Sequence, residues 1–114
     1  MTTRFLGAHY EQQALNYLQQ KGCCLIAKNF NCRMGEVDLI CSEQTALLFI
    51  EVRYRQQKAY GSALESVNFY KQKKIKKAAQ YFLLAHPQFQ NLFMRFDVVA
   101  IDDKEINWIQ GAFY

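Results

Sequence analysis

The chain has 114 residues, of which 51% are hydrophobic and 21% charged, as is ordinary for a globular protein. This length predicts a single domain over 1–114 with one hydrophobic core and excludes a two-domain organisation. No stretch reaches the roughly 18 apolar residues that cross a bilayer, and the first residues lack the apolar core of a signal peptide. We therefore expect a cytoplasmic protein that binds no membrane.

The formal net charge is +4, but the positive charge is concentrated in one part of the sequence. Residues 53–77 carry eight lysines and arginines and a single acid, Glu65, whereas the rest of the chain is net acidic. Such a basic segment suits a polyanionic partner, above all nucleic acid. The alternative is a solvated helix face without a partner.

The N-terminal segment predicts a helix over residues 4–21. Apolar and small residues recur at helical spacing from Gly7 to Leu18, and Gly22 follows the pattern as a helix terminator. On this helix Glu11 lies beside the apolar face, at about 60° from Ala14 when each residue turns by ~100°. Its carboxylate is therefore placed to reach whatever the helix packs against.

Three short runs with strand character follow, near residues 24–30, 36–41 and 46–54. The polar tetrapeptide SEQT separates the last two runs and predicts a hairpin turn. The four cysteines form no CxxC pair, so we expect free thiols rather than a metal site.

The second half of the chain predicts one more helix and two strands. The helix is expected over residues 67–85, capped by Ser66 and stopped by His86-Pro87, because the residue before proline avoids the helical region. Residues 94–101 and 105–109 have strand character. The resulting order, α-β-β-β-α-β-β, predicts an α/β fold in which helices flank a mixed sheet.

Two of the predicted strands carry acids where buried strands usually carry none. If residues 43–46 form the hairpin turn, Asp38 faces Glu51 and Glu36 faces Arg53. The Cβ atoms of a facing pair lie ~4.5–5.5 Å apart. Two carboxylates at such a distance repel by about 3 kcal/mol at an effective dielectric constant of ~20. A shared proton, a nearby cation or a divalent metal would each offset this repulsion.

A hard divalent cation is one of these options. Mg²⁺ prefers carboxylate, water and phosphate oxygens, and Glu11 could supply a third carboxylate. Arg53 projects from the same strand face as Glu51. Acids, an adjacent cation and a basic segment together suit the binding and hydrolysis of a phosphodiester.

A structural ion network is the other reading of the same acids. In that case Asp38 and Glu51 pair with arginines, for which Arg33, Arg53 and Arg95 are available. The sequence alone leaves both interpretations open.

The second predicted helix places one lysine differently from its neighbours. Lys71 shares the face of Ile75 and Phe82, whereas Lys73 and Lys77 point the opposite way. Lys71 is therefore expected to reach toward the acids. The alternative is that its ammonium group extends past the helix end into water.

Two further features have simpler structural interpretations. Asp97 lies in an apolar run two residues from Arg95, and we expect an internal ion pair. Tyr54, Tyr60, Phe69 and Tyr70 stand among basic residues and could stack on unpaired bases. Aromatic residues more often belong to the core.

Several stretches resemble one bacterial protein family nearly from end to end. They are LGAHYEQQALNYLQQKGCCLIAKNF, GEVDLI, LLFIEVRYR, the lysine-rich helix that begins at Lys71, and RFDVVAI. In this order they resemble the YraN family, also called uncharacterised protein family 0102. The resemblance implies a minimal member of the PD-(D/E)XK nuclease superfamily, with the restriction-endonuclease-like fold and similarity to archaeal Holliday-junction resolvases.

The resemblance also implies roles for individual residues. Asp38 and Glu51 correspond to the two motif acids, which bind Mg²⁺ or Mn²⁺ in nucleases of this superfamily. Glu11 corresponds to an acid from the first helix and Glu36 to the acid of the GE-(I/V)-D signature. Arg53 takes the position of the motif lysine.

Arginine at position 53 is a departure from the motif. Its guanidinium stays protonated, so it cannot act as a general base, although it could hold the scissile phosphate. Lys71 could substitute for the missing amine. Arg53, Arg55, Lys71 and Lys74 are expected to contact the nucleic-acid backbone.

The function implied is that of a nucleic-acid-binding, metal-dependent endonuclease, with DNA, including branched DNA such as Holliday junctions, as the expected partner. Junction-resolving relatives act as dimers, so a homodimer is also expected. Two alternatives remain open. One is a catalytically inactive nucleic-acid-binding module on the same fold, and the other is an adaptor whose basic helix binds an acidic protein.

Overall fold

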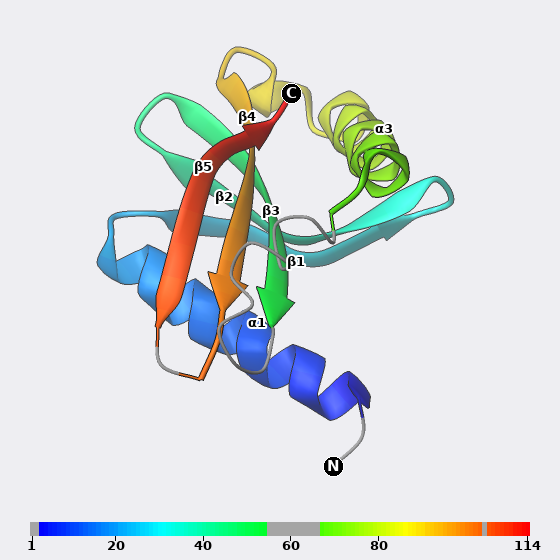
Figure 1. Cartoon of the computed structure of the whole chain (residues 1–114). Helices are drawn as coiled ribbons and strands as arrows, with labels where there is room; N and C mark the ends of the chain where they lie inside the picture. The colour runs from blue at the N-terminus through cyan, green and yellow to red at the C-terminus, as the bar shows by residue number, and fades with distance from the viewer. Residues whose placement is uncertain (1–2, 55–66, 104) are drawn as a thin grey trace.

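A computed structural model describes residues 3–54, 67–103 and 105–114 of the chain (Figure 1). Its helices and strands follow one another in the predicted order. They are α1 (Thr3–Gln20), β1 (Cys24–Cys32), β2 (Gly35–Glu43), β3 (Ala46–Tyr54), α3 (Phe69–Ala85), a short 3₁₀ helix (Pro87–Phe89), β4 (Phe93–Ile101) and β5 (Ile106–Phe113). The predicted α/β arrangement is thereby confirmed.

The five strands form one mixed sheet in the order β1-β2-β3-β4-β5. β3 and β4 are parallel, and the other neighbouring strands are antiparallel. The parallel pair requires a crossover, and α3 lies in that connection. β1 and β5 are the two edges of the sheet. No helix in the described part of the chain is long and apolar enough to span a membrane.

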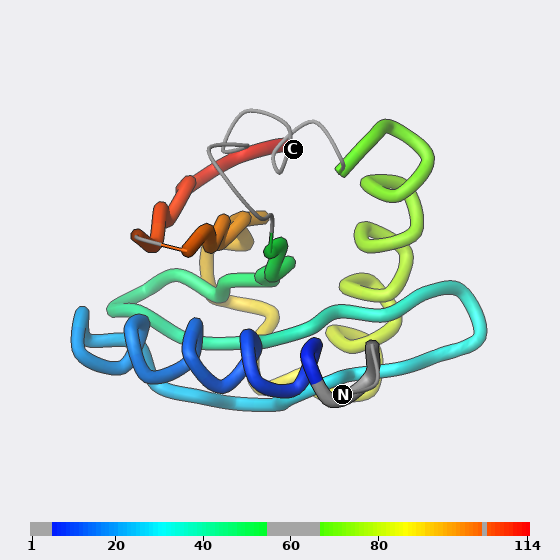
Figure 2. Tube along the Cα trace, turned by 60° about the horizontal axis from the view of Figure 1, so that its bottom comes forward, coloured from blue at the N-terminus to red at the C-terminus, as the bar shows by residue number. Residues whose placement is uncertain are grey.

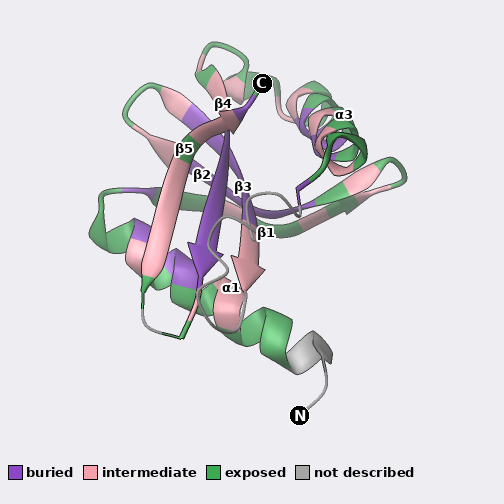
Figure 3. Cartoon of the chain, in the orientation of Figure 1, coloured by how far each residue is buried: buried purple, intermediate pink, exposed green. Residues whose placement is uncertain are grey.

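The two helices cover opposite faces of the sheet, and each face has its own apolar core. α1 contributes Ala14, Leu15 and Leu18 to a cluster that includes Leu39 and Ile50. α3 lies on the other face, as the two views together show (Figures 1 and 2). Its residues Ile75, Ala78, Ala79 and Phe82 pack with β-strand residues that include Val37, Phe49 and Phe96. The buried positions gather in the central strands and the inner sides of both helices (Figure 3).

The helix ends follow from local chemistry. Gly22 has a φ of +100°, a left-handed conformation that glycine adopts without strain, and it follows the last turn of α1. The cap of α3 is Asn68, whose side-chain oxygen accepts a hydrogen bond from the Lys71 N–H. The cap predicted at Ser66 lies outside the described residues. At the other end, His86 before Pro87 terminates α3 as predicted.

The β2–β3 hairpin has the predicted register near its turn. Glu43 pairs with Ala46, and each following pair is in step as far as Leu39 and Ile50. The pairing then stops, so the expected face-to-face pairs Asp38–Glu51 and Glu36–Arg53 do not form as ladder partners. From here β2 remains paired with β1, and Glu36 lies opposite Asn31. The β1–β2 hairpin thus extends away from β3 and passes beside α3 (Figure 1).

Asp97 is the centre of a buried polar network, and its predicted pairing with Arg95 is confirmed. The carboxylate is fully buried and accepts two hydrogen bonds of 2.9 Å from the Arg95 guanidinium. It accepts two more from Trp108 Nε1 and from the Gly111 N–H, both on β5. The β4–β5 register shifts between Phe96 and Val98, at the position of Asp97. The side chain therefore binds β5 where the regular ladder is interrupted.

Replacing Asp97 by asparagine should lower the free energy of unfolding by about 3 kcal/mol or more. The amide would present N–H groups to hydrogen-bond donors and leave the Arg95 charge without its buried counterion. Urea unfolding followed by circular dichroism measures the change. Glu105→Gln, at an exposed position on the same hairpin, is the matched control and should change stability by less than about 0.5 kcal/mol. Equal stabilities of the two variants would contradict the role assigned to Asp97.

Candidate functional site

The site begins at the point where β2 separates from β3. Asp38, only 8% exposed, accepts a hydrogen bond of 2.8 Å at Oδ2 from the Val52 N–H. This bond satisfies a β3 main-chain donor just past the last ladder pair with β2, Leu39–Ile50. It also fixes the Asp38 carboxylate against β3, next to Glu51.

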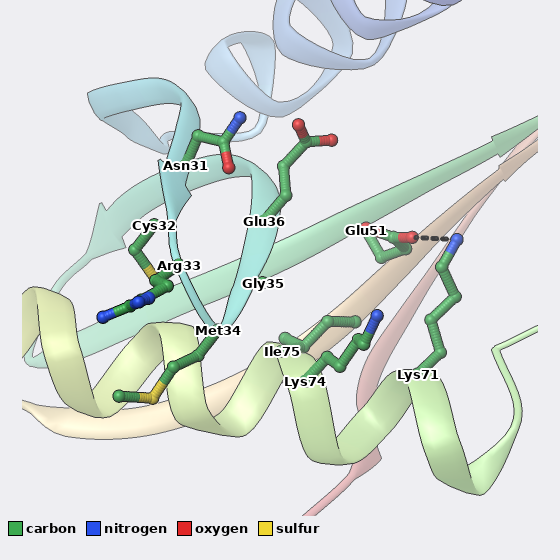
Figure 4. A pocket seen from close by; sticks show the side chains of 10 residues that line it. All are labelled: Asn31, Cys32, Arg33, Met34, Gly35, Glu36, Glu51, Lys71, Lys74 and Ile75. Atoms are coloured by element: carbon green, nitrogen blue, oxygen red, sulfur yellow. Dashed lines mark ion pairs between the residues drawn. The ribbon is translucent and has the colours of Figure 1, made fainter.

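Glu51 is the residue around which the site is organised. Its side chain is 9% exposed, and its Oε2 lies 2.7 Å from Arg53 Nη2 and 3.6 Å from Lys71 Nζ. Arg53 comes from the same strand face, as predicted from the alternation of side chains. Lys71 reaches Glu51 from the first turn of α3, as its place on the predicted helix indicated (Figure 4).

Burial dominates the electrostatics of Glu51 and raises its pKa to about 8. The negative charge of Asp38 and a hydrogen bond between the two carboxyl groups also contribute to this raised value. Arg53 and Lys71 lower it but do not compensate for burial. At neutral pH the site therefore favours the protonated form of Glu51.

Arg53 contacts Glu51 as a charge rather than as a well-directed hydrogen-bond donor. Its Nε and Nη2 atoms are buried and find no hydrogen-bond acceptor among the described residues, although Nη2 lies so close to Glu51. A buried donor without an acceptor costs about 1–3 kcal/mol; this applies to Nε, whereas the ion pair with Glu51 offsets the cost for Nη2. An anionic ligand that accepted these hydrogen bonds would remove that cost.

A cavity of about 370 Å³ opens beside Glu51, between the β1–β2 hairpin and α3. Lys71, Lys74 and Ile75 line it from α3, and Met34 and Gly35 from the hairpin turn (Figure 4). A Cβ atom on Gly35 would lie 2.7 Å from the main-chain oxygen of Lys74. Glycine at this position therefore allows α3 to approach the hairpin closely enough for its lysines to border the cavity.

Of the other two predicted acids, Glu36 also lines the Glu51 cavity, whereas Glu11 does not. Glu11 and Glu36 line a second cavity of about 430 Å³ together with Asn29 and Asn31. In Figure 4 the Glu36 side chain points toward α1 and away from Lys71. The pKa of Glu11 is raised, mainly by burial and next by the charge of Asp38, so Glu11 and Asp38 interact electrostatically.

A metal site in this region would therefore depend mainly on two acids. Within residues 3–54, 67–103 and 105–114, no three His, Cys, Asp or Glu side chains gather closely enough to hold a metal ion. Asp38 and Glu51 are neighbouring buried carboxylates, which is the kind of oxygen donor that a hard divalent cation takes. Glu11 is near enough to Asp38 to influence it but belongs to the neighbouring cavity.

The remaining predicted residues have different outcomes. Lys74 borders the Glu51 cavity, whereas Arg55 lies outside the described residues. Arg33 is exposed and points away from Glu51 (Figure 4), and Arg95 pairs with Asp97 and Glu43, so neither belongs to a network with the two acids. All four cysteines are free thiols, and burial raises the pKa of Cys23 to about 11.

Sequence reasoning missed two contributors to the site. One is Gly35, which begins the GEVDLI motif. Its position directly after a turn is the sequence signal that could have indicated a close approach of another element. The bond from Val52 to Asp38 had no signal in the sequence, because alternation along a strand does not show where two strands separate.

The pKa of Glu51 leads to a test by pH. Because its folded-state pKa of about 8 lies above its ordinary value of 4.5, the folded protein holds a proton that the unfolded chain has lost between these values. The stability that Glu51 contributes is therefore present at low pH and lost as the pH rises toward 8 and above. In Glu51→Gln this dependence disappears. We expect the difference in unfolding free energy to shift in favour of the variant by on the order of 2–4 kcal/mol between pH 5 and pH 9.

The measurement is urea unfolding of both proteins across this pH range in metal-free buffer. Glu105→Gln serves again as the control and should leave the pH profile unchanged. A constant difference between wild type and Glu51→Gln would show that Glu51 has no raised pKa.

The fold and the site together define a small α/β protein with a five-stranded mixed sheet, whose central strands present a buried carboxylate pair beside basic side chains. Comparison with known proteins identifies the family within this class. The profile of the uncharacterised protein family UPF0102 matches residues 10–101, and the chain belongs to this family.

Bacterial relatives align with nearly the whole chain. A UPF0102 protein of Saccharophagus degradans is 47% identical over 107 residues, which cover 94% of this chain and 91% of the relative. One of Stutzerimonas stutzeri is 46% identical over 111 residues, with 94% and 92% covered. One of Legionella pneumophila is 41% identical over 113 residues, with 97% and 96% covered. The family resemblance inferred from the sequence motifs is thereby confirmed.

Proposed function

We propose that the protein binds nucleic acid and hydrolyses phosphodiester bonds with Mg²⁺ or Mn²⁺. One observation carries the proposal, namely the convergence of Asp38, Arg53 and Lys71 on the buried carboxylate of Glu51. The resemblance of GEVDLI and FIEVRYR to the PD-(D/E)XK motif supports the same conclusion. Asp38 and Glu51 would hold the metal, with Glu11 as a neighbouring acid.

A bound divalent cation would lower the pKa of a water molecule and neutralise charge that develops on the phosphate. The protein's own residues have separate tasks. Arg53 remains charged and brings two unsatisfied N–H donors, Nε and Nη2, which suit a phosphate oxygen. The Lys71 side chain is 45% exposed; its ammonium group pairs with Glu51 and also lines the cavity. It would neutralise and orient the phosphate that enters the cavity.

The basic side chains around the cavity support a polyanionic substrate. Lys71 and Lys74 line the cavity directly, and Arg33 lines it from the hairpin turn. Such an arrangement attracts nucleic acid independently of sequence, with an affinity that falls as salt rises. DNA, including branched DNA, is the substrate that the resemblance to junction-resolving enzymes suggests.

A second candidate function is a nucleic-acid-binding module without catalysis on the same fold. The ion pairs of Glu51 with Arg53 and Lys71 favour it, because they partly neutralise the carboxylate without a metal. Both candidates predict salt-dependent binding of nucleic acid, but only the first predicts cleavage that requires the two acids.

Asp38→Asn and Glu51→Gln should each reduce Mn²⁺-dependent cleavage by about 100-fold or more, because each removes a metal-binding carboxylate. The assay uses supercoiled, linear, branched and single-stranded DNA, with products separated on denaturing gels. Glu105→Gln, purified in parallel, should retain wild-type activity. Cleavage that persists in both acid variants would refute the enzymatic proposal, and absence of cleavage by the wild type with intact binding would favour the second candidate.

Lys71→Met should lower cleavage by about 10-fold or more, because the cation that shares Glu51 with the cavity is lost. The matched control is Lys76→Met, on the same helix, where Lys76 Nζ lies over the Phe113 ring rather than at the cavity. Single-turnover rates of the two variants measure the difference. Equal rates would remove Lys71 from the site.

A further inference from the structure

A second basic cavity lies next to the Glu51 cavity, farther around α3 from the buried face that carries Ile75. It has a volume of about 250 Å³ and is lined by Met34, Tyr70, Lys73, Lys74 and Lys77. Met34 and Lys74 also line the Glu51 cavity, so the two cavities are neighbours that share these two side chains. In Figure 4 the Met34 side chain lies against the α3 ribbon. We call these five residues the α3 surface.

Large side chains with apolar surface are exposed at and next to the α3 surface. Tyr70 is 68% exposed and Met34 49% exposed, and the neighbouring Phe69 is 70% exposed. Lysines lie over both rings, with Lys74 Nζ at 4.8 Å from the Tyr70 centroid and Lys73 Nζ at 5.5 Å from that of Phe69. The high exposure of Tyr70 shows that ring surface remains accessible beside Lys74.

The positive charge of α3 favours a polyanionic partner. The sequence of α3 contains five lysines and no acid, and none of the residues that line the α3 surface is acidic. A second copy of the chain docking through this face would place lysines against lysines. Protein interfaces in general are depleted of lysine. A polyanion with flat apolar groups satisfies both the charge and the aromatic rings, and nucleic acid has this chemistry.

We propose that the α3 surface binds unpaired nucleotides next to the Glu51 cavity. Lysines contact the phosphates in any nucleic acid, but an exposed ring gains stacking energy only from a base whose face is free. Bases within a duplex already stack on their neighbours, so Tyr70 contributes little to duplex binding. The proposal rests on the proposed function and narrows its substrate to single strands or to duplexes with an unpaired segment.

Fluorescence anisotropy on the full chain tests this, with a labelled single-stranded DNA of about 20 nucleotides and a hairpin duplex of the same composition. Metal-free buffer prevents cleavage during the measurement. The wild type should bind the single strand more tightly. Tyr70→Leu should lower single-strand affinity about tenfold and duplex affinity less than twofold, because leucine keeps apolar bulk but cannot stack. Tyr70→Trp should retain the preference.

Two controls separate stacking from other effects. Leu84→Ala removes another exposed apolar side chain of α3, outside both cavities, and should change neither affinity. The double variant Lys73→Ala, Lys77→Ala should bind single-stranded and duplex DNA more weakly by the same factor. It should also reduce the slope of log affinity against log salt concentration by about 1–2.

The outcomes distinguish this proposal from the proposed function. If Tyr70→Leu lowers single-strand and duplex affinity equally, or lowers neither, the α3 surface does not bind unpaired bases. The proposal that the protein hydrolyses phosphodiester bonds is unaffected by this result. If the protein prefers single strands but shows no Mn²⁺-dependent cleavage, the proposal for the α3 surface is supported and the proposed enzymatic activity is refuted. Absence of binding to both DNAs overturns the nucleic-acid partner itself and directs the search to acidic proteins.

Discussion

The hydrogen bond from the Val52 N–H to the Asp38 carboxylate is the interaction on which the site depends. A strand in the middle of a sheet normally satisfies its main-chain donors with the neighbouring strand. Here the Asp38 side chain of β2 accepts the hydrogen bond of a β3 main-chain donor past the last ladder pair. β2 then continues its ladder with β1, while β3 continues its ladder with β4. The cavity beside Glu51 lies where the β1–β2 hairpin has left β3 and faces α3. The same bond fixes one carboxylate at the point where β2 and β3 separate, next to Glu51.

The second constraint is the charge balance at Glu51. Desolvation opposes its ionisation, and so does Asp38, whereas the two neighbouring cations favour it. Because burial outweighs both cations, a small change in surrounding charge alters the protonation of Glu51. The carboxylate is therefore poised to exchange a proton for another cation.

Much of this arrangement is accessible from the sequence, because it depends on periodicity. The hairpin register follows from the turn at residues 43–46, and alternation along β3 places Arg53 beside Glu51. Helical spacing likewise places Lys71 on the buried side of α3. The separation of β2 from β3 is not accessible in this way, because the alternating pattern is the same whether or not the partner strand follows. For the same reason Glu36 was expected opposite Arg53, whereas it faces Asn31 across the β1–β2 ladder.

Arginine at position 53 determines which group can respond to pH at this site. A guanidinium keeps its proton under all conditions in which the protein is folded, so Arg53 contributes a constant charge. A lysine in the same buried place could lose its proton, because burial disfavours the charged amine. With arginine there, titration near neutral pH falls to Glu51, whose pKa is raised to about 8. If the site binds the proposed metal, its affinity should rise with pH as this carboxylate ionises, because a cation must displace the proton of Glu51. In the proposed function Arg53 would bind the phosphate with a charge that does not change with pH, so phosphate binding and metal binding would differ in their pH dependence.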